Sequence, residues 1–458
     1  MMAVCVFVAL SALLFVGKIV RMKLTILQRL YLPSSVVGGL IGLAAVSVFG
    51  YFMPEDGVAI AQKVPGFLIN VVFATLFLGA ATPKVRDVVK FAMPQLCIGQ
   101  LLAWGQYVVG LGLAGFVFVR LFGVPAVFGN LLEIGFEGGH GTVGGMLESF
   151  EAFGWEDGIA LGYTMATAGM ILGIVLGMAM IQWAYKRRIV TQVVAFGDRR
   201  LHERKGVHPR RSRPAAGRQT VMSDSIDSLA WHLAVTGVAV MIGVGLHSLI
   251  PMKGFPLFPL CMIGGVILEV AAKFVGKDLL LDRGQMERIS GASLDYLVVA
   301  AVATIQLRVV AENWLPLMIL IIAGTAWSCL VVLCVAPRVF RTAWFERAIA
   351  EFGQAMGVTA TGLLLLRTVD PENRTPAAMS FGYKQLLHEP FMGGGIWTAV
   401  AFTLVYRIGW LNTWLVCLAM LVVWGTVAFC LWRRNLSIVA KNSAGGRKPA
   451  SRKGRKVK

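Results

Sequence analysis

Charged residues are scarce in this 458-residue chain, since Asp, Glu, Lys and Arg together make up only 15% of it. Soluble domains carry roughly a quarter of their residues as charges. This shortage, together with 57% hydrophobic residues, excludes an ordinary soluble domain. Long apolar runs recur instead, and many approach the roughly 20 residues that cross a bilayer as a helix. The sequence therefore predicts an all-α polytopic membrane protein.

Motifs that would indicate an enzyme or a metal site are also missing. The chain has no HExxH and no GxSxG segment, and its seven cysteines form no close CxxC pair. Cysteines in or beside apolar runs are typical of small buried residues. We therefore expect no enzyme activity, no cofactor, no zinc site and no disulfide framework. The chain also lacks a selectivity-filter repeat that would indicate an ion channel.

Acidic residues are outnumbered, because 24 Asp and Glu face 43 Lys and Arg, which gives a net charge of +19. Two segments hold this excess. Residues 186–220 contain eleven Lys or Arg against two acids, and residues 433–458 contain ten and no acid. Cytoplasmic segments of membrane proteins are rich in these residues, so both are predicted to be cytoplasmic and close to anionic membrane lipid. No aromatic pattern accompanies the charge, and a nucleic-acid partner is not expected.

The apolar runs and the alternation of basic with non-basic loops predict eleven spans. These are 3–20, 33–53, 64–82, 94–119, 158–183, 229–250, 255–273, 292–310, 314–336, 388–406 and 411–432. The positive-inside bias then puts the N-terminus outside and the C-terminus in the cytoplasm. This alternation holds only if the chain leaves each of the two gaps, 120–157 and 340–387, on the same side of the membrane where it entered. Each gap is therefore predicted to hold a re-entrant hairpin, about 125–150 from outside and about 348–366 from inside.

Three segments of the first half recur in order in the second half. PSSVVGGLIG (33–42) resembles PLCMIGGVIL (259–268), ATLFL (74–78) resembles ATIQL (303–307), and EIGFEGGHGT (133–142) resembles EFGQAMGVTA (351–360). The loop charges give the two halves opposite orientations, and inverted repeats with broken elements are typical of secondary transporters. The predicted parts are a first repeat at 1–183, a basic loop at 184–228, a second repeat at 229–410, a last helix at 411–432 and a basic tail at 433–458.

Two glycine-rich segments, GFEGGHGTVGG at 135–145 and GQAMGVTATG at 353–362, interrupt the apolar sequence. Glycine lets backbone approach a ligand closely, and the N–H groups at the start of a half-helix suit a carboxylate. Carbonyl and hydroxyl oxygens nearby suit Na⁺, whereas plain helix packing is the alternative role of such residues. The predicted substrate site comprises Gly138, Gly139, His140, Gly141, Thr142, Gly357, Thr359 and Thr361. The predicted Na⁺ ligands are Thr142, Gly353, Thr359, Thr75 and Thr304.

Several side chains near these segments have more than one possible role. His140 either binds substrate or a proton, or hydrogen-bonds a backbone carbonyl and holds the hairpin. Thr75 and Thr304 occupy matched positions, where a hydroxyl commonly bonds back within its own helix. Glu133 is expected in the outer mouth. Arg367 either forms an ion pair with Asp370 that closes the base of the second hairpin, which is the favoured interpretation, or contacts a substrate carboxylate.

GGHGT at 138–142, which follows a Gly-rich lead-in, resembles the signature of the bacterial sodium/glutamate symporter family. The G-x-x-x-G-x-T-x-T pattern of 353–361 resembles the second-hairpin motif of that family, and 33–39 and 73–78 resemble segments of its first half. The resemblance implies Na⁺-coupled uptake of L-glutamate across the bacterial inner membrane by a homodimer. It also implies a scaffold and a moving transport domain in each protomer, with the binding sites at the hairpin tips.

The predicted function is therefore a secondary active transporter that works by elevator-like alternating access. Na⁺ is the expected coupling ion, and the expected substrate is L-glutamate or a related small amino acid or carboxylate. Gln354, Ala355 and Met356 depart from the family's second-hairpin motif, which widens the range of expected substrates. The alternative is a proton-coupled or exchange transporter of the same fold, in which His140 and Glu137 carry protons.

Overall fold

The computed structural model describes residues 1–49, 55–80, 85–190, 204–209, 213–250, 254–276, 279–371 and 373–445. All regular elements among them are helical, as predicted. Parts of the basic loop, at 191–203 and 210–212, and the end of the basic tail, at 446–458, lie outside the described residues.

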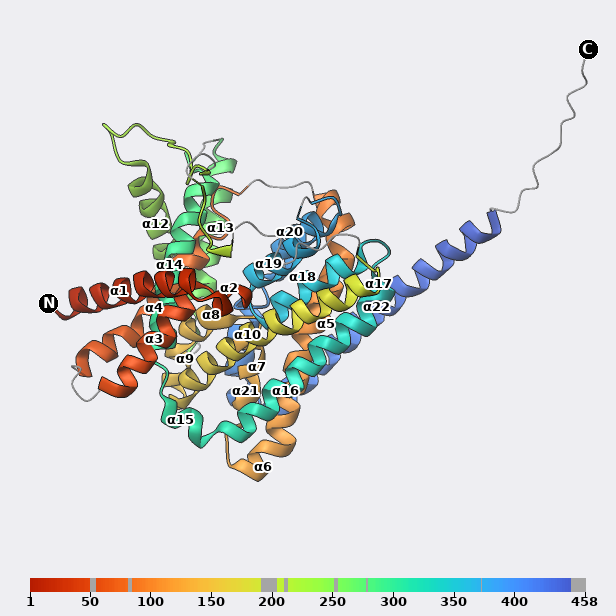
Figure 1. Cartoon of the computed structure of the whole chain (residues 1–458), viewed down its shortest axis with the longest axis horizontal. Coiled ribbons are helices and arrows are strands. Elements are labelled where there is room, and N and C mark those ends of the chain that lie inside the picture. Colours follow the sequence, from red (N-terminus) through yellow and green to blue (C-terminus); the bar gives the residue numbers. More distant parts are fainter. Residues whose placement is uncertain are drawn as a thin grey trace, which may run out of the picture.

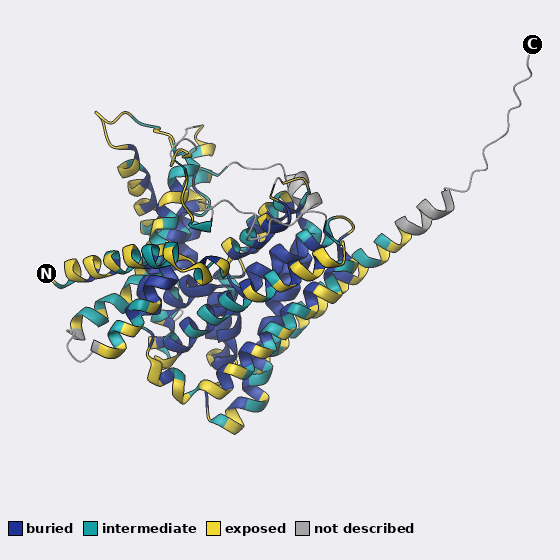
Figure 2. Ribbon diagram, viewed as in Figure 1, coloured by how far each residue is buried: buried dark blue, intermediate teal, exposed yellow. Residues whose placement is uncertain are grey.

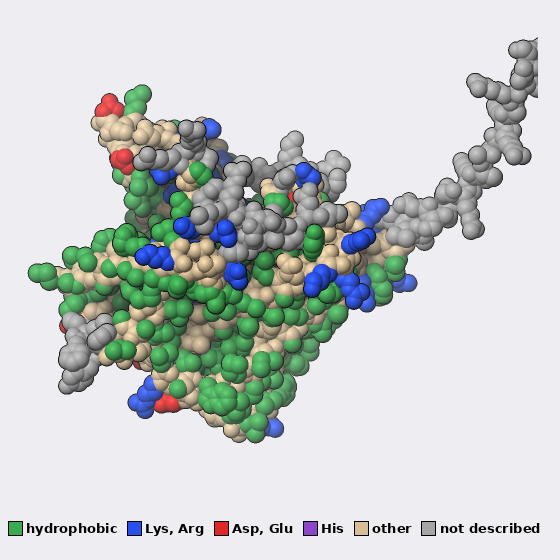
Figure 3. Space-filling view, viewed as in Figure 1, with side chains coloured by type: hydrophobic (Ala, Val, Ile, Leu, Met, Phe, Trp, Pro, Cys, Tyr) green, Lys and Arg blue, Asp and Glu red, His purple; other side chains and the backbone are tan. Residues whose placement is uncertain are grey.

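Within the described part of the chain, seven helical segments are long and apolar enough to cross a membrane, which confirms a multi-pass membrane protein. They are Met2–Lys23, Asp56–Thr75, Ala92–Phe122, Asp157–Lys186, Ser228–Ser248, Trp314–Val339 and Trp410–Ser437. Figure 3 shows hydrophobic side chains over much of one face of the molecule. The most apolar stretch of the last segment is only 11% buried, compared with 61% for Ala92–Phe122. The last helix therefore presents its apolar surface outward, whereas Ala92–Phe122 belongs to the interior.

Six helices form one bundle, at the left of Figure 1, which we call the glycine-packed bundle. They are α1 (Met2–Lys23), α3 (Ser34–Phe49), α4 (Glu55–Thr75), α12 (Ser228–Ser248), α13 (Phe258–Phe274) and α14 (Arg283–Ala303). Two Gly-Gly pairs hold it together. A methyl group added at Gly38 would lie 2.4 Å from the carbonyl oxygen of Leu13, and one at Gly264 would lie 2.2 Å from that of Ala239. Only glycine lets these backbones come so close.

Long and short helices from both halves of the chain form a second bundle, which we call the polar-core bundle (Figure 1). Its members are α5 (Val85–Leu113), α7 (Leu131–Gly135), α8 (Gly139–Gly145), α9 (Leu147–Ala152), α10 (Asp157–Lys186), α16 (Trp314–Leu330), α18 (Trp344–Met356), α19 (Thr359–Val369), α20 (Ala377–His388), α21 (Ile396–Arg407) and α22 (Trp410–Gly445). Figure 2 shows that most fully buried residues lie in this bundle. The short α8 lies between the bundles, since it packs against α4 and α14 as well as α10.

Both α5 and α16 end in a π-helical turn that continues into a short α-helix. The first turn, η2, covers Ala114–Phe118 and leads into α6 (Val119–Phe122), and the second, η5, covers Val331–Val335 and leads into α17 (Ala336–Val339). The short segments α2 (Thr25–Arg29), η3 (Ala126–Asn130) and α15 (Leu307–Glu312) complete the described elements.

Three predicted spans are wrong. The span at 64–82 is instead α4, which begins at Glu55 and ends at Thr75. The span at 388–406 is instead two helices, α20 and α21, with residues 389–395 between them. Gly393 and Gly394 have φ values of +65° and +108°, which an α-helix cannot contain. The span at 292–310 is instead α14, which begins earlier because the Asp282 carboxylate caps it by accepting from the N–H of Gln285 (3.0 Å).

Candidate functional site

The first glycine-rich segment is interrupted, as predicted, between α7 and α8. Residues 136–138 form a turn, and Gly139 begins α8 with a φ of +68°, a left-handed conformation that favours glycine. The N–H of Gly138 donates to the carbonyl oxygen of Glu133 (3.0 Å). The Thr142 hydroxyl donates to the carbonyl oxygen of Gly138 (2.9 Å), which ties the start of α8 to the turn.

The second segment is interrupted at residues 357–358, between α18 and α19. These two helices lie side by side along their length, because Gly353 and Gly362 face each other. A methyl group added at Gly353 would lie 2.7 Å from Cα of Gly362. Thr361 is 6% exposed, and its hydroxyl lies beside Gly357.

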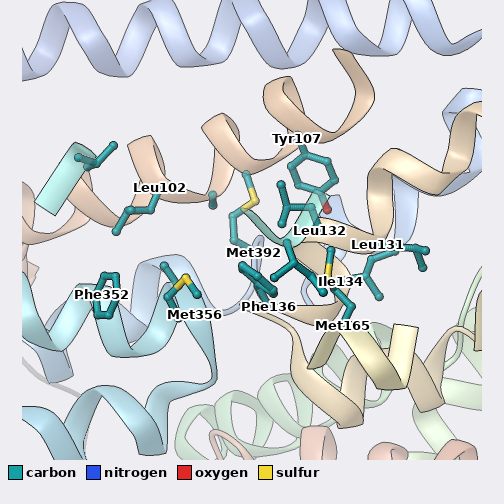
Figure 4. Packing of buried hydrophobic residues seen from close by; sticks show 14 of the residues in the cluster. Leu102, Tyr107, Leu131, Leu132, Ile134, Phe136, Met165, Phe352, Met356 and Met392 are labelled. Carbon is teal, nitrogen blue, oxygen red and sulfur yellow. The ribbon is translucent and has the colours of Figure 1, made fainter. Parts of the chain in front are cut away.

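Helix α10 brings the two interruptions together. Its Gly169 touches both, since an added methyl group would lie 2.6 Å from the Phe136 ring and 2.6 Å from the carbonyl oxygen of Met356. The interruptions also touch directly, because Gly139 lies against Val358. Figure 4 shows the buried side chains around this contact, including Phe136, Met165 and Met356.

The helices that begin at the two interruptions run in opposite directions along α10. Helix α8 runs toward the start of α10, where Val143 packs on Gly162, and α19 runs toward its end, where Leu365 packs on Gly177. The first, unpaired N–H groups of both helices therefore lie near the contact between the interruptions.

A third interruption, residues 389–395, was not predicted and packs against the first. The N–H of Gly393 donates to the Glu133 carboxylate (2.8 Å). The Thr142 hydroxyl lies 3.5 Å from the carbonyl oxygen of Gly393, and a methyl group added at Gly394 would lie 2.5 Å from that hydroxyl. Thr142 thus stands between the carbonyl oxygen of Gly138, at the start of α8, and that of Gly393, in the third interruption.

Glu133 is fully buried, so the expectation that it lies in an outer mouth was wrong. Besides Gly393, its carboxylate accepts from the Tyr107 hydroxyl (2.6 Å) and the Thr398 hydroxyl (2.9 Å). These three neutral donors compensate for its removal from water. The carboxylate thereby links α5, α7 and the start of α21.

Glu137 is also buried and contacts His388, with 2.5 Å between its Oε1 and the imidazole Nε2. The orientation of the imidazole follows from its other neighbours. The indole N–H of Trp104 donates to Oε1 of Gln100, which turns the Gln100 amide nitrogen toward Nδ1 of His388. Nδ1 therefore accepts, and Nε2 carries the proton that it donates to Glu137. Oε2 of Glu137 is buried without a partner among the described residues.

A chain of buried polar groups continues from Glu137 along α18. The Gln354 amide nitrogen lies 3.4 Å from Glu137, and its amide oxygen accepts from the Lys384 ammonium (3.0 Å). Lys384 in turn pairs with the Glu351 carboxylate (3.1 Å), and both side chains are 0% exposed. The Gln95 amide bridges Glu351 and Arg347. This set, the buried ionic chain, joins α5, α18 and α20 to the first interruption.

The predicted residues of the two interruptions have definite partners. Nε2 of His140 lies 2.9 Å from the Thr167 hydroxyl, whose own proton goes to the carbonyl oxygen of Tyr163. His140 therefore donates to α10 rather than to a carbonyl, and its ring stacks on that of Tyr163. The Thr359 hydroxyl donates to the Glu389 carboxylate (2.7 Å) and accepts from Gln385 (2.6 Å). Gly141 packs on the side chain of Ile69.

Thr75 and Thr304, the two remaining predicted Na⁺ ligands, lie apart from each other. They stand at opposite ends of the glycine-packed bundle, because Arg283, at the start of α14, binds the Thr75 carbonyl oxygen, while Thr304 follows the end of α14. Each hydroxyl bonds back within its own helix, to Val72 and Ala300 respectively. Thr304 also lines a pocket of about 130 Å³ between the bundles, together with Gln62, Lys63, Leu147, Glu151, Glu156 and Gln306.

The expected Arg367–Asp370 ion pair is replaced by local bonds. Asp370 accepts from the backbone N–H groups of Arg374 (2.8 Å) and Thr375 (2.9 Å) and from the Thr375 hydroxyl, whereas Arg367 is exposed. Asp370 thus ends α19 by capping the following turn.

Sequence reasoning missed Lys384, His388, Gln95 and the role of Glu351. One signal was present, because Glu133 and Glu351 occupy the same register in the EIGFEGGHGT and EFGQAMGVTA match. A second was the four-residue spacing of Lys384 and His388, which puts both on one face of a helix. No group of His, Cys, Asp and Glu side chains suited to a transition metal occurs among the described residues.

A family model described as sodium/glutamate symporter matches residues 1–371, which is most of the chain. No curated protein and no solved structure gives a significant match. The match also confirms that the protein is a transporter and not an enzyme. The chain belongs to the sodium/glutamate symporter family.

Proposed function

We propose that this protein couples the inward movement of Na⁺ to uptake of L-glutamate or a related small amino acid or carboxylate. The observation that carries the proposal is the contact of two interrupted, glycine-rich segments, Gly139 against Val358, at the middle of α10. Sodium-coupled symport is the activity named for the family to which the chain belongs. In the membrane, each segment would be the tip of a re-entrant hairpin.

Matched contacts support an inverted repeat behind these hairpins. Gly38 packs on α1 and Gly39 on Val302 of α14, while Gly264 packs on α12 and Gly265 on Ala74 of α4. Each Gly-Gly pair therefore contacts its own preceding helix and the third helix of the other half. The π-helical turns η2 and η5 are a second matched feature. The repeats would be 1–183 and 229–410, followed by one further helix.

The substrate would bind where α8 and α19 begin. Their unpaired N–H groups, at Gly139, His140, Gly141 and Thr359, would face a substrate carboxylate. Gly138, Thr142, Gly357 and Thr361 would shape the same site. Na⁺ prefers oxygen ligands, and the Thr142 hydroxyl with the carbonyl oxygens of Gly138 and Gly393 supplies three close together. Thr359 and the backbone of Gly353 would contribute from the second hairpin. Thr75 and Thr304 are left out of this site.

The polar-core bundle would move as the transport domain, and the glycine-packed bundle would act as the scaffold of a homodimer in the bacterial inner membrane. The N-terminus would lie outside and the C-terminus in the cytoplasm. Na⁺ binding would order the tips and complete the carboxylate site. Coupling then requires that the Na⁺-free tips bind substrate poorly, because a ligand shifts an equilibrium only by its differential affinity for the two states.

Uptake by proteoliposomes tests this function. Purified protein should concentrate labelled L-glutamate, or a related carboxylate or amino acid from a small panel, only when an inward Na⁺ gradient is present. Choline at equal ionic strength is the control. Absence of concentrative uptake of every panel member under a Na⁺ gradient would reject the proposal.

One observation favours a second candidate, a proton-coupled transporter of the same fold. Oε2 of Glu137, in the first interruption, is buried and has no partner among the described residues, so it can hold a proton there. In that case uptake should persist in choline at fixed external pH and should require an inward proton gradient.

A further inference from the structure

The Lys384 ammonium lies in a buried position between two oxygen acceptors. Its side chain is 0% exposed, and its ammonium lies 3.1 Å from Oε2 of Glu351 and 3.0 Å from Oε1 of Gln354. Both are oxygen acceptors, the ligand type that hard monovalent cations prefer. Gly99 of α5 makes the room, because a methyl group there would lie 2.8 Å from Nζ and 2.5 Å from Cε of Lys384.

The position is linked to the transport site by a single side chain. The Gln354 amide accepts from Lys384 with its oxygen and donates toward Glu137 with its nitrogen. Glu137 belongs to the first interruption, and Gln354 lies three residues before the second. A positive charge at Nζ therefore acts on the tips across one amide, in an interior where charges are weakly screened.

The charges around this point also indicate a need for a cation. Three buried carboxylates, those of Glu137, Glu351 and Glu389, interact with the Lys384 ammonium. His388, at the end of α20, is neutral, since its Nδ1 accepts from Gln100 and its Nε2 donates to Glu137. Arg347 lies one turn before Glu351 on α18, interacts with that carboxylate and donates to Gln95. Lys384 is the cation that lies on the other side of Glu351, toward Gln354 and Glu137.

We propose that the Lys384 ammonium is a tethered cation, which fills a monovalent-cation site formed by Glu351 and Gln354 and takes the place of a coupling ion there. The expected effect on Na⁺ coupling rests on the proposed transport function, whereas the cation site itself rests only on the contacts of Lys384. The fixed charge travels with α18 and α20 in every step, so it neutralises Glu351 without being released. Truncation of Lys384 should open the site to free Na⁺.

A matched pair of variants tests this inference. Lys384→Ala keeps Glu351 and removes the tethered charge, whereas Lys384→Met combined with Glu351→Gln removes both charges and fills most of the space. The measurements are the Na⁺-to-substrate ratio from reversal potentials in proteoliposomes, and the thermal midpoint of purified protein in NaCl against choline chloride.

Lys384→Ala should transport one more Na⁺ per substrate than the wild type. Its thermal midpoint should rise in NaCl by several degrees more than that of the wild type, and the double variant should show neither change. The inference is overturned if Lys384→Ala keeps the wild-type ratio and Na⁺ response, if the double variant gains the same response, or if Lys384→Ala unfolds equally in both salts.

The two proposals fail in different ways. A wild-type protein without any Na⁺ response would reject Na⁺ coupling, yet Lys384→Ala that acquires one would still support the tethered cation. A Na⁺-dependent wild type whose Lys384→Ala variant gains no Na⁺ response would reject the tethered cation alone.

Discussion

Glu133 and Glu351 occupy matched positions in the two halves of the chain, and both are fully buried, yet they are stabilised differently. Glu133 is surrounded by neutral donors, namely two hydroxyls and one backbone N–H. Glu351 is paired with the Lys384 ammonium and with the Gln95 amide. The Glu133 carboxylate is therefore buried without a counter-ion, whereas the Glu351 carboxylate is buried together with the opposite charge of Lys384.

This difference separates two glutamates that occupy the same register in the two matched sequence segments. Neutral donors hold Glu133 in place, where it fixes the third interruption through Gly393. Glu351 instead forms a buried ion pair with the Lys384 ammonium.

Glu351→Gln should be the most damaging single change, because it leaves the Lys384 ammonium buried without its carboxylate. Breaking a buried pair in this way costs about 3–5 kcal/mol. We expect strongly reduced folded protein, measured by size-exclusion profile and thermal midpoint. Addition of Lys384→Met should restore most of the midpoint, and a double variant no more stable than Glu351→Gln would contradict the charge argument.

Glu133→Gln should cost much less, about 1 kcal/mol, since the new amide can keep its neighbours satisfied. Its oxygen can accept from Gly393 and Thr398, and its nitrogen can donate to the Tyr107 oxygen. The thermal midpoint should fall by only a few degrees. A loss as large as that of Glu351→Gln would remove the contrast between the two carboxylates.

Gly38→Ala and Gly264→Ala should be equally harmful, because both added methyl groups would meet a backbone carbonyl oxygen. Overpacking of this kind costs about 1–3 kcal/mol. Comparable drops in thermal midpoint would show that the halves remain equivalent in the glycine-packed bundle. Gly237→Ala, where an added methyl group meets nothing within 4 Å, is the control.

Thr142→Ala and Thr359→Ala should affect binding more than stability. Each loses a hydroxyl worth about 0.5–1.5 kcal/mol, which corresponds to roughly a two- to tenfold higher Na⁺ or substrate requirement. The measurement is the Na⁺ concentration for half-maximal uptake at unchanged expression. An equal loss of expressed protein and of activity would favour plain packing for these threonines.

Much of the fold could be predicted because it depends on local patterns. Long apolar runs predicted the helices near 3–20, 94–119, 158–183, 229–250, 314–336 and 411–432, all of which coincide with segments able to span a membrane. Glycine clusters predicted the two interruptions, since consecutive glycines weaken a helix wherever they occur. The break at 389–395 also contains three glycines, but the apolar residues after it resembled a continuous span.

The polar core could not be predicted in the same way, because its partners are far apart in sequence. Lys384 meets Glu351 and lies against Gly99, and Glu133 meets Tyr107 and Gly393. A buried carboxylate and one in a water-filled mouth look identical in sequence. Only the tertiary arrangement distinguishes them, which is why Glu133 was misplaced.

Helix α10 bears on whether the two interruptions move at the same time. It touches α8 at Gly162, both interruptions at Gly169 and α19 at Gly177, and at these three positions it has no side chain. A displacement of α10, which is one continuous helix, would therefore reach both interruptions together. The two sides of the proposed binding site would then open and close in synchrony, without a half-assembled intermediate.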